Sequence, residues 1–342
     1  MSQKNLNATS KTHKNLFNYL NDKRIFQIYK KFEKKFSLKE DFIVAVSGGP
    51  DSLALSFLTK IYSVKKSLSV KYYIVDHRLR KNSSFESISV KNHLKKFHIS
   101  ADILKWTGIK PTSNIQSLAR EKRYSLLISQ AKKLNIRYIL TGHHLNDLYE
   151  NFFIRILRGS GLNGLISLDE KAINQEINIF RPLINFEKND LIYLSKKIFN
   201  FYINDPSNFN DKFKRVRIRN LVNNFNNEGL DKHKLLLTIK NLKDSNETIK
   251  FYTEKNLKDN CHFYKNKVIL NSKFFNQPHE ITFRSVMEII KYVGNKHYPV
   301  RGKKVDKIIN LIKHDNRSNL KATLGNCVFI RVNHSIIVIK EQ

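Results

Sequence analysis

Residues 43–52 read Ile-Val-Ala-Val-Ser-Gly-Gly-Pro-Asp-Ser, an apolar run that leads into a glycine turn. The apolar run predicts a buried strand that ends at Val46, and the helical spacing that follows predicts a helix beginning near Asp51. A turn of this kind leaves backbone N–H groups unpaired at the positive end of a helix dipole. The stretch therefore predicts an anion-binding site between a strand and a helix.

The turn has residue types that suit a phosphate. Gly48 and Gly49 let the backbone approach closely and take a positive φ where needed, while Ser47 and Ser52 add hydroxyl donors. No lysine follows the glycines, so this is not the GxxxxGK[ST] loop. An ordinary glycine turn is the alternative, and the complete string Ser-Gly-Gly-Pro-Asp-Ser argues against it. The string resembles the pyrophosphate loop of N-type ATP pyrophosphatases, which cleave ATP between the α and β phosphates and form an adenylated intermediate.

Outward from this turn, apolar segments alternate with helical patterns. Strands are expected over 42–46, 70–75, 101–106 and 138–141, with helices near 51–63, 84–97 and 114–134. This alternation predicts an α/β fold with a doubly wound parallel sheet, in which ligands bind at the carboxyl ends of the strands. Ser47, Asp76-His77 and Gly142-His143-His144 each follow a strand, so all three are expected at one crevice.

The rest of the chain predicts further helices and a second domain. Helices are expected over 15–36, 145–157, from about 187, over the basic string RVRIRN (215–220), and near 284–293 and 303–313, with a closing hairpin of 327–332 and 335–339. The expected division is a basic N-terminal helical extension (1–40), a catalytic domain (41–222), a helical linker (223–260) and a small α+β C-terminal domain (261–342).

Composition limits the class of protein. The 342 residues suggest about two domains, and no apolar run is long enough to span a bilayer. No signal-peptide pattern is present, and Cys261 and Cys327 are too far apart for a CxxC metal site. We therefore expect a cytoplasmic protein.

The charge points to a large anionic partner. The formal net charge is +33 and the isoelectric point about 10.0. A general enrichment in Lys, Asn and Ile contributes to this excess. Nucleic acid is still the partner that such a surface fits best.

A group of polar residues follows the strand at 138–141. Asp147 and Glu150 are three residues apart, so both carboxylates are expected on one helix face, and His143 is expected on the same face. A solvated charged face and a metal site are the alternatives. A carboxylate here could accept a proton from an amine nucleophile, bind an ammonium group, or hold Mg²⁺ on ATP. The spacing does not divide these roles.

The helix at 114–124 places two arginines one turn apart. The planar, permanently charged forks of Arg120 and Arg123 suit phosphate oxygens. A position on a solvated face is the alternative, and it is stronger for Arg123.

Seven strings occur in an order that identifies a family. They are SGGPDS, VDHRLR (75–80), NIQSLAREKRY (114–124), TGHHLNDLYENFFIRILRGSGLNGL (141–165), RPLI (181–184), DPSN (205–208) and RVRIRN. Together they resemble the tRNA(Ile)-lysidine synthetase family over about residues 41–222. The segments PVR (299–301) and KATLGNCVFIR (321–331) resemble it less closely.

The resemblance implies a two-step reaction. ATP adenylates the ring carbonyl oxygen of the wobble cytidine in tRNA(Ile) with a CAU anticodon, and L-lysine then displaces AMP through its side-chain amine. The product, lysidine, changes the codon read from AUG to AUA and the amino-acid identity from Met to Ile. A homodimer is also implied.

The resemblance further assigns roles to residues. The ATP phosphates would be bound by Ser47, Gly48, Gly49, Pro50, Asp51 and Ser52, with Asp51 near Mg²⁺. The catalytic residues would be Asp51, Arg120, His143, Asp147 and Glu150. Candidate tRNA contacts are His77, Arg123, Arg158, Gly159, Ser160, Gly161, Arg217, Arg219 and the basic C-terminal part.

The chain departs from the family at three positions near this motif. The family commonly has an aspartate where this chain has Asn146, and often has Gln and Thr where it has Leu148 and Asn151. The change at Asn146 puts a magnesium or ammonium contact in doubt but leaves the Asp147–Glu150 pair.

Three other functions fit less well. A tRNA thiolase usually needs reactive or cluster-binding cysteines near its site, and a GMP or NAD synthetase needs an ammonia supply and a small substrate. A non-catalytic tRNA-binding protein would be expected to lose the phosphate loop or the carboxylates, and both are present.

Overall fold

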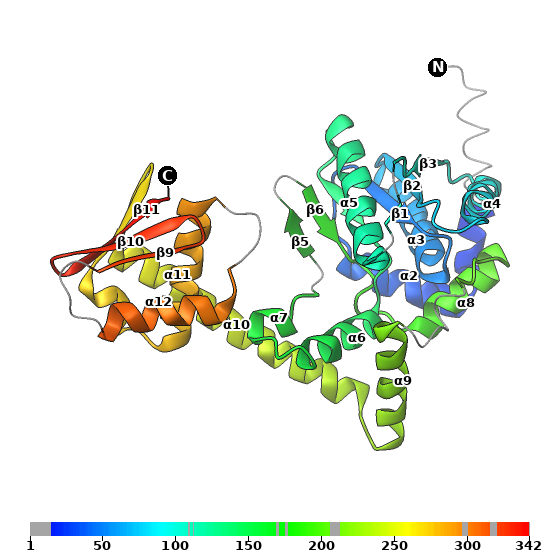
Figure 1. The fold of residues 1–342 in the computed structure, drawn as a ribbon. Coiled ribbons are helices and arrows are strands. Elements are labelled where there is room, and N and C mark those ends of the chain that lie inside the picture. Colours follow the sequence, from blue (N-terminus) through cyan, green and yellow to red (C-terminus); the bar gives the residue numbers. More distant parts are fainter. Residues whose placement is uncertain are drawn as a thin grey trace. The chain divides into compact units, whose positions relative to one another are not determined.

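The computed structural model describes residues 15–108, 110–111, 113–168, 171–174, 177–205, 213–295, 300–314 and 320–341. Residues 206–208 of the DPSN string, Pro299 and the first 14 residues of the N-terminal extension lie outside the described residues. The chain divides into two compact units, Met1–Lys232 and His233–Gln342 (Figure 1). We describe each unit by itself.

The first unit is built on a six-stranded sheet with the order β3-β2-β1-β4-β6-β5. Its strands are β1 (Phe42–Val46), β2 (Val70–Asp76), β3 (Ala101–Lys105), β4 (Tyr138–Leu140), β5 (Lys171–Asn174) and β6 (Ile177–Phe180). In this spatial order, β3, β2, β1, β4 and β6 pair in parallel with their neighbours. The edge strand β5 pairs with β6 in antiparallel orientation. The predicted parallel sheet is confirmed.

Helices connect and cover these strands. They are η1 (Tyr19–Asn21), α2 (Lys23–Lys35), α3 (Pro50–Lys66), α4 (Ser83–Lys96), α5 (Ile115–Lys133), α6 (Leu145–Ile156), α7 (Leu162–Leu165), α8 (Lys188–Phe199) and α9 (Lys214–Asn227).

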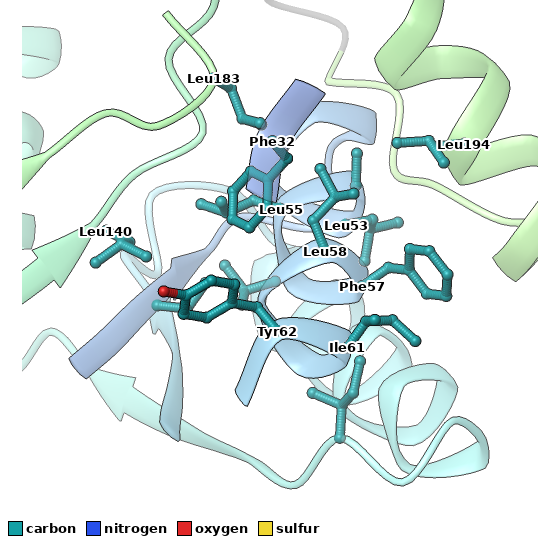
Figure 2. Close-up of a cluster of buried hydrophobic side chains, with 14 of the residues drawn as sticks. Phe32, Leu53, Leu55, Phe57, Leu58, Ile61, Tyr62, Leu140, Leu183 and Leu194 are labelled. Atoms are coloured by element: carbon teal, nitrogen blue, oxygen red, sulfur yellow. The ribbon is translucent and has the colours of Figure 1, made fainter. Parts of the chain in front are cut away.

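The side chains of β1 alternate between two cores, which explains why helices cover both faces of the sheet. Phe42 and Val44 pack in the cluster that contains α3, and Figure 2 shows part of this cluster around Leu58 and Tyr62. Ile43, on the other face, packs in the cluster that contains Leu127 of α5. Because successive strand residues point to opposite faces, an apolar run such as 42–46 is stable only when both faces are covered.

One expectation for this unit was wrong. The segment 15–36 is not one helix, because the Asp22 side chain accepts hydrogen bonds from the N–H groups of Arg24 and Ile25 and so begins a new helix, α2. The strands β5 and β6 were not predicted. Both are short, and Asn174 and Asn178 interrupt the apolar run that marks a buried strand.

The second unit contains a five-stranded antiparallel sheet with the order β7-β8-β11-β10-β9. Its elements are α10 (Lys232–Asn260), β7 (Cys261–Tyr264), β8 (Lys267–Leu270), η3 (Ser272–Asn276), α11 (His279–Gly294), α12 (Gly302–His314), β9 (Lys321–Leu324), β10 (Cys327–Val332) and β11 (Ser335–Lys340). The predicted hairpin is β10–β11, and the short strands β7, β8 and β9 were not predicted. The last strand in sequence, β11, lies at the centre of the sheet.

Helices α11 and α12 close the core of this unit. Val286 and Ile289 from α11 and Ile309 from α12 are buried with Phe329 and Val338 from the central strands. Among the described residues, no helix is both long and apolar enough to cross a membrane.

Candidate functional site

The phosphate loop lies between β1 and α3. Gly49 is the N-cap of α3 and has no side chain to cap it, and Pro50 starts the first turn. The Ser52 hydroxyl instead ties the loop together, because it accepts a hydrogen bond from the Ser47 N–H (3.1 Å) and donates one to the Gly49 carbonyl (3.0 Å). The loop is thus held in shape while the helix N-terminus stays available for an anion.

Two glycines allow close backbone approach at this loop. Gly48 has φ +83°, and a Cβ there would lie 2.5 Å from Cγ2 of Val90. Gly142 follows β4, and its Cβ would lie 3.1 Å from the Asp51 carbonyl carbon and 3.1 Å from the Ser52 nitrogen. Gly142 therefore lets the end of β4 pack directly on the first turn of α3, a role the sequence did not reveal.

A cleft of about 680 Å³ opens at the carboxyl ends of the strands. Residues from all three predicted strand-end motifs line it, including Ser47, His77 and His143. The other predicted site residues in its lining are Asp51, Ser52, Arg120 and Arg123. Arg80 and Arg215, which the sequence did not single out, also line it.

Asp51 is paired with a lysine that the sequence analysis missed. Lys188 Nζ lies 2.7 Å from Oδ1 and 2.6 Å from Oδ2 of Asp51. Lys188 begins α8, 137 residues further along the chain. Because ion pairs over such a separation depend on the fold, no local pattern indicated this contact.

The Asp51 carboxylate fits one kind of magnesium site. The described residues contain no group of three or more His, Cys, Asp or Glu side chains that could hold a metal ion. Mg²⁺ in nucleotide enzymes is usually held by one or two carboxylates together with substrate phosphates. A single carboxylate beside a phosphate loop therefore matches a Mg²⁺ ion that arrives on ATP.

His143 lies in the turn after β4 rather than on α6, which corrects the predicted shared face with Asp147. Helix α6 begins at Leu145, with His144 as its N-cap. The Nδ1 atom of His143 lies 2.8 Å from the Thr141 hydroxyl. Burial lowers the pKa of His143 to about 3, against the opposing charge of Asp147. His143 is therefore a neutral imidazole at pH 7 and a weak base.

His144 connects the phosphate loop to the carboxylates of α6. Its Nε2 atom lies 3.7 Å from Oδ1 of Asp51 and 3.6 Å from Oδ2 of Asp147. The backbone N–H of His144 also donates to Oδ2 of Asp147 at 3.0 Å, which completes a capping box. The start of α6 is thus fixed beside Asp51.

The Asp147–Glu150 pair is bound by two arginines of α9. Arg215 reaches both carboxylates, with Nη2 2.6 Å from Oδ1 of Asp147 and Nε 2.6 Å from Oε2 of Glu150. Arg219 Nε lies 2.7 Å from Oε1 of Glu150. Burial would raise the pKa of Asp147, but the neighbouring His144, Arg215 and His143 outweigh it and hold that pKa well below its usual range.

A spacing argument could have found the arginine pair. Arg215 and Arg219 are four residues apart, so they share one helix face, whereas Arg217 lies on another. The sequence analysis grouped Arg217 and Arg219 as tRNA contacts. The structure instead places Arg219 on Glu150 and leaves the Arg217 side chain exposed.

His77 and Arg123 form a second corner of the cleft. The Arg123 Nε donates to Nε2 of His77 at 3.5 Å, and the ring of Trp106 meets that of His77 edge to face. Burial and the positive charge of Arg123 lower the pKa of His77 to about 4. The His77 ring is therefore uncharged at pH 7.

The glycine-rich loop after α6 lies apart from the cleft lining. Arg158 and Gly159 are exposed, Ser160 is half-buried, and Gly161 is the N-cap of the short helix α7.

Both cysteines are buried in the core of the second unit, and neither lines the cleft.

Comparison with known proteins shows the family to which this chain belongs. The PP-loop domain family matches residues 20–225. The tRNA(Ile)-lysidine synthase of Wolbachia pipientis wMel is 34% identical over 303 residues, which cover 87% of this chain and 70% of that protein. The enzyme of the same name from Orientia tsutsugamushi (strain Boryong) is 33% identical, over 87% of this chain and 69% of that protein.

A solved structure supports the fold alone. The U34-tRNA thiolase NcsA from Methanococcus maripaludis, solved with its [4Fe-4S] cluster, superposes with a TM-score of 0.56 at 15% identity. The match covers 64% of this chain and 78% of the thiolase.

The family match and the two sequence relatives together show the family. The chain belongs to the tRNA(Ile)-lysidine synthase family of PP-loop enzymes, which are ATP-dependent ligases.

Proposed function

We propose that this enzyme joins lysine to the wobble cytidine of tRNA(Ile) with a CAU anticodon, through an adenylated cytidine. The observation that supports this proposal is His144, whose Nε2 atom lies within 4 Å of both Asp51 of the phosphate loop and Asp147 of the buried carboxylate pair. Asp51 and Arg215, the cation bound to that pair, both line the cleft. The names of the relatives support lysine and tRNA(Ile) as the substrates. The product, lysidine, would change the codon read from AUG to AUA and the identity from Met to Ile.

The loop residues 47–52 bind the phosphates of ATP in this proposal. The N–H groups at the start of α3 supply donors, and the Ser47 hydroxyl supplies another when it turns away from Ser52. Ser52 holds the loop in shape through its contacts with Ser47 and Gly49. Arg120 lines the same cleft and supplies a positive charge for the α-phosphate. Mg²⁺ would be held by the phosphates and by Asp51 once that carboxylate is released from Lys188, and it would supply charge neutralisation.

The first step transfers the adenylyl group. The ring carbonyl oxygen of cytidine attacks the α-phosphorus, and the bond to the β-phosphate breaks to release pyrophosphate. The protein contributes mainly position and charge to such a step. Arg120 and the helix N-terminus would stabilise the negative charge that develops on the phosphate oxygens.

The second step attaches lysine. The side-chain amine attacks the ring carbon that carries the adenylate, the C–O bond breaks, and AMP leaves. The ammonium form must first lose a proton, and a carboxylate of the Asp147–Glu150 pair is the candidate acceptor. Asp147 and Glu150 would bind the ammonium before that transfer.

The basic surface would bind the tRNA. A net charge of +33 favours a polyanion, and the candidate contacts are His77, Arg123, Arg158, Gly159, Ser160, Gly161, Arg217 and the second unit. A homodimer and a cytoplasmic location also follow from the family and remain predictions.

Lysine incorporation tests the proposal. Purified protein is given radiolabelled lysine, ATP and an unmodified tRNA(Ile) transcript with a CAU anticodon, with a methionine tRNA as the matched control. ATP-dependent label in the isoleucine tRNA alone is the expected result. Pyrophosphate release that depends on another RNA or a small molecule, without label, would contradict the substrate assignment.

A further inference from the structure

Arg215 divides the oxygens of the two carboxylates into two sets. Oδ2 of Asp147 accepts from the His144 backbone, and Oε1 of Glu150 pairs with Arg219. Oδ1 of Asp147 and Oε2 of Glu150 both face Arg215, each at 2.6 Å. If Arg215 moved, one oxygen of each carboxylate would be freed while its other oxygen stayed fixed.

The position that Arg215 fills suits an ammonium group. A primary ammonium has three N–H donors and no acceptor, and two converging carboxylate oxygens can receive two of them. Two cations cannot share these oxygens at hydrogen-bond distance without strong repulsion. An incoming lysine side chain and Arg215 would therefore compete for one place.

In the proposed complex, Arg215 has a second anionic partner, the phosphates of ATP. Its side chain is 41% exposed and lines the same cleft as Ser47 and Arg120, where the phosphates of ATP are proposed to bind. An anion there would attract the guanidinium by a bidentate, charge-assisted contact. The Glu150 carboxylate, only 3% exposed, would keep Arg219 as its counterion.

We infer that Arg215 closes the lysine-binding site until nucleotide draws it away, so that lysine binds after ATP. This inference rests on the proposed function. It adds an order of binding: the ammonium site forms only when an anion occupies the phosphate side of the cleft. The nucleotide and lysine are then coupled through one side chain, and such coupling typically changes affinity by about 5- to 150-fold.

Lysine binding in three proteins tests the inference. Equilibrium dialysis with labelled lysine compares wild type, Arg215→Gln and Lys214→Gln, each with and without α,β-methylene ATP. Lys214 is the matched control, because it is exposed, carries the same charge and is the preceding residue on α9. Wild type and Lys214→Gln should bind lysine about tenfold more tightly when the analogue is present.

The variant should lose this dependence. Arg215→Gln should bind lysine without nucleotide about tenfold more tightly than wild type, and the analogue should add little. Arg215→Lys keeps the charge and should stay near wild type without nucleotide, which separates release of the site from unfolding. Adding Asp147→Asn to Arg215→Gln should remove the gain.

Two results would overturn the inference. In one, wild type and Arg215→Gln bind lysine with equal affinity in the absence of nucleotide. In the other, the lysine affinity of wild type is the same with and without the ATP analogue. If wild type still labels tRNA(Ile) with lysine in either case, the proposed function stands and the ordering fails. A wild type that incorporates no lysine overturns both.

Discussion

A methyl group at Gly142 should disturb ATP binding, because Gly142 packs against the backbone of the phosphate loop. In Gly142→Ala the new Cβ would lie 3.1 Å from the Asp51 carbonyl carbon, 3.1 Å from the Ser52 nitrogen and 3.2 Å from the Asp51 oxygen. Ordinary contacts begin near 3.4 Å. All three atoms are backbone, so the first turn of α3 must move by about 0.3 Å for the methyl group to fit.

The cost follows from this displacement. Overpacking of this kind destabilises by about 1–3 kcal/mol, while the loss of glycine entropy in the unfolded chain returns about 0.4–1 kcal/mol. The net effect is about 1–2 kcal/mol, which lowers the melting temperature of the first unit by about 2–8 °C. Moving the Ser52 N–H also weakens one charge-assisted hydrogen bond to phosphate, so the Kd for ATP should rise about tenfold.

The assay compares Gly142→Ala with Gly161→Ala by thermal unfolding and by ATP titration. Gly161 has φ −66° and nothing within 4 Å of a built Cβ, so the same methyl group meets open space there. We expect Gly161→Ala to match wild type in both measurements. ATP affinity and melting temperature that are the same in the two variants would refute the argument from close backbone approach.

Four other changes probe separate parts of the molecule. Asp147→Ala should abolish lysidine formation but keep tRNA affinity in a filter-binding assay, and normal turnover would reject the carboxylate assignment. If about six phosphates are contacted, the logarithm of tRNA affinity should fall with the logarithm of salt at a slope of about −4 to −5, whereas a flat response would mean that the basic surface does not bind tRNA. Leu58→Ala, at a fully buried position, should lower the free energy of unfolding by about 2–5 kcal/mol in denaturant titration. Because the folded-state pKa of His143 is about 3, the unfolded chain binds more protons than the folded chain below pH 6.5, so His143 should contribute a fall in stability of about 2 kcal/mol from pH 7 to pH 5. His143→Gln should remove that part of the slope and leave the part due to His77, whose pKa is lowered to about 4.

Local patterns predicted the centre of the fold well. The strand at 42–46, the glycine turn and the following helix are consecutive in sequence, and their signals are a buried apolar run and a glycine pair. The same holds for the β10–β11 hairpin, whose strands are separated by two residues. In these elements the stabilising contacts and the sequence signal come from the same few residues.

The rest depends on contacts between distant segments. Lys188 and Asp51 are 137 residues apart, and Arg215 and Asp147 are 68 apart, so neither pair leaves a local signature. Short strands such as β6 are stabilised by neighbours that arrive from elsewhere in the chain. The sequence analysis thus named Asp51 and Asp147 as candidates but not their counterions Lys188 and Arg215.

The place of β11 has a genetic consequence. This strand joins β8 to β10, so without it the sheet of the second unit separates into the pairs β7–β8 and β9–β10. Isolated hairpins are marginally stable at best. A premature stop codon before Ser335 would therefore act like deletion of the whole second unit, while every codon for the cleft would still be translated.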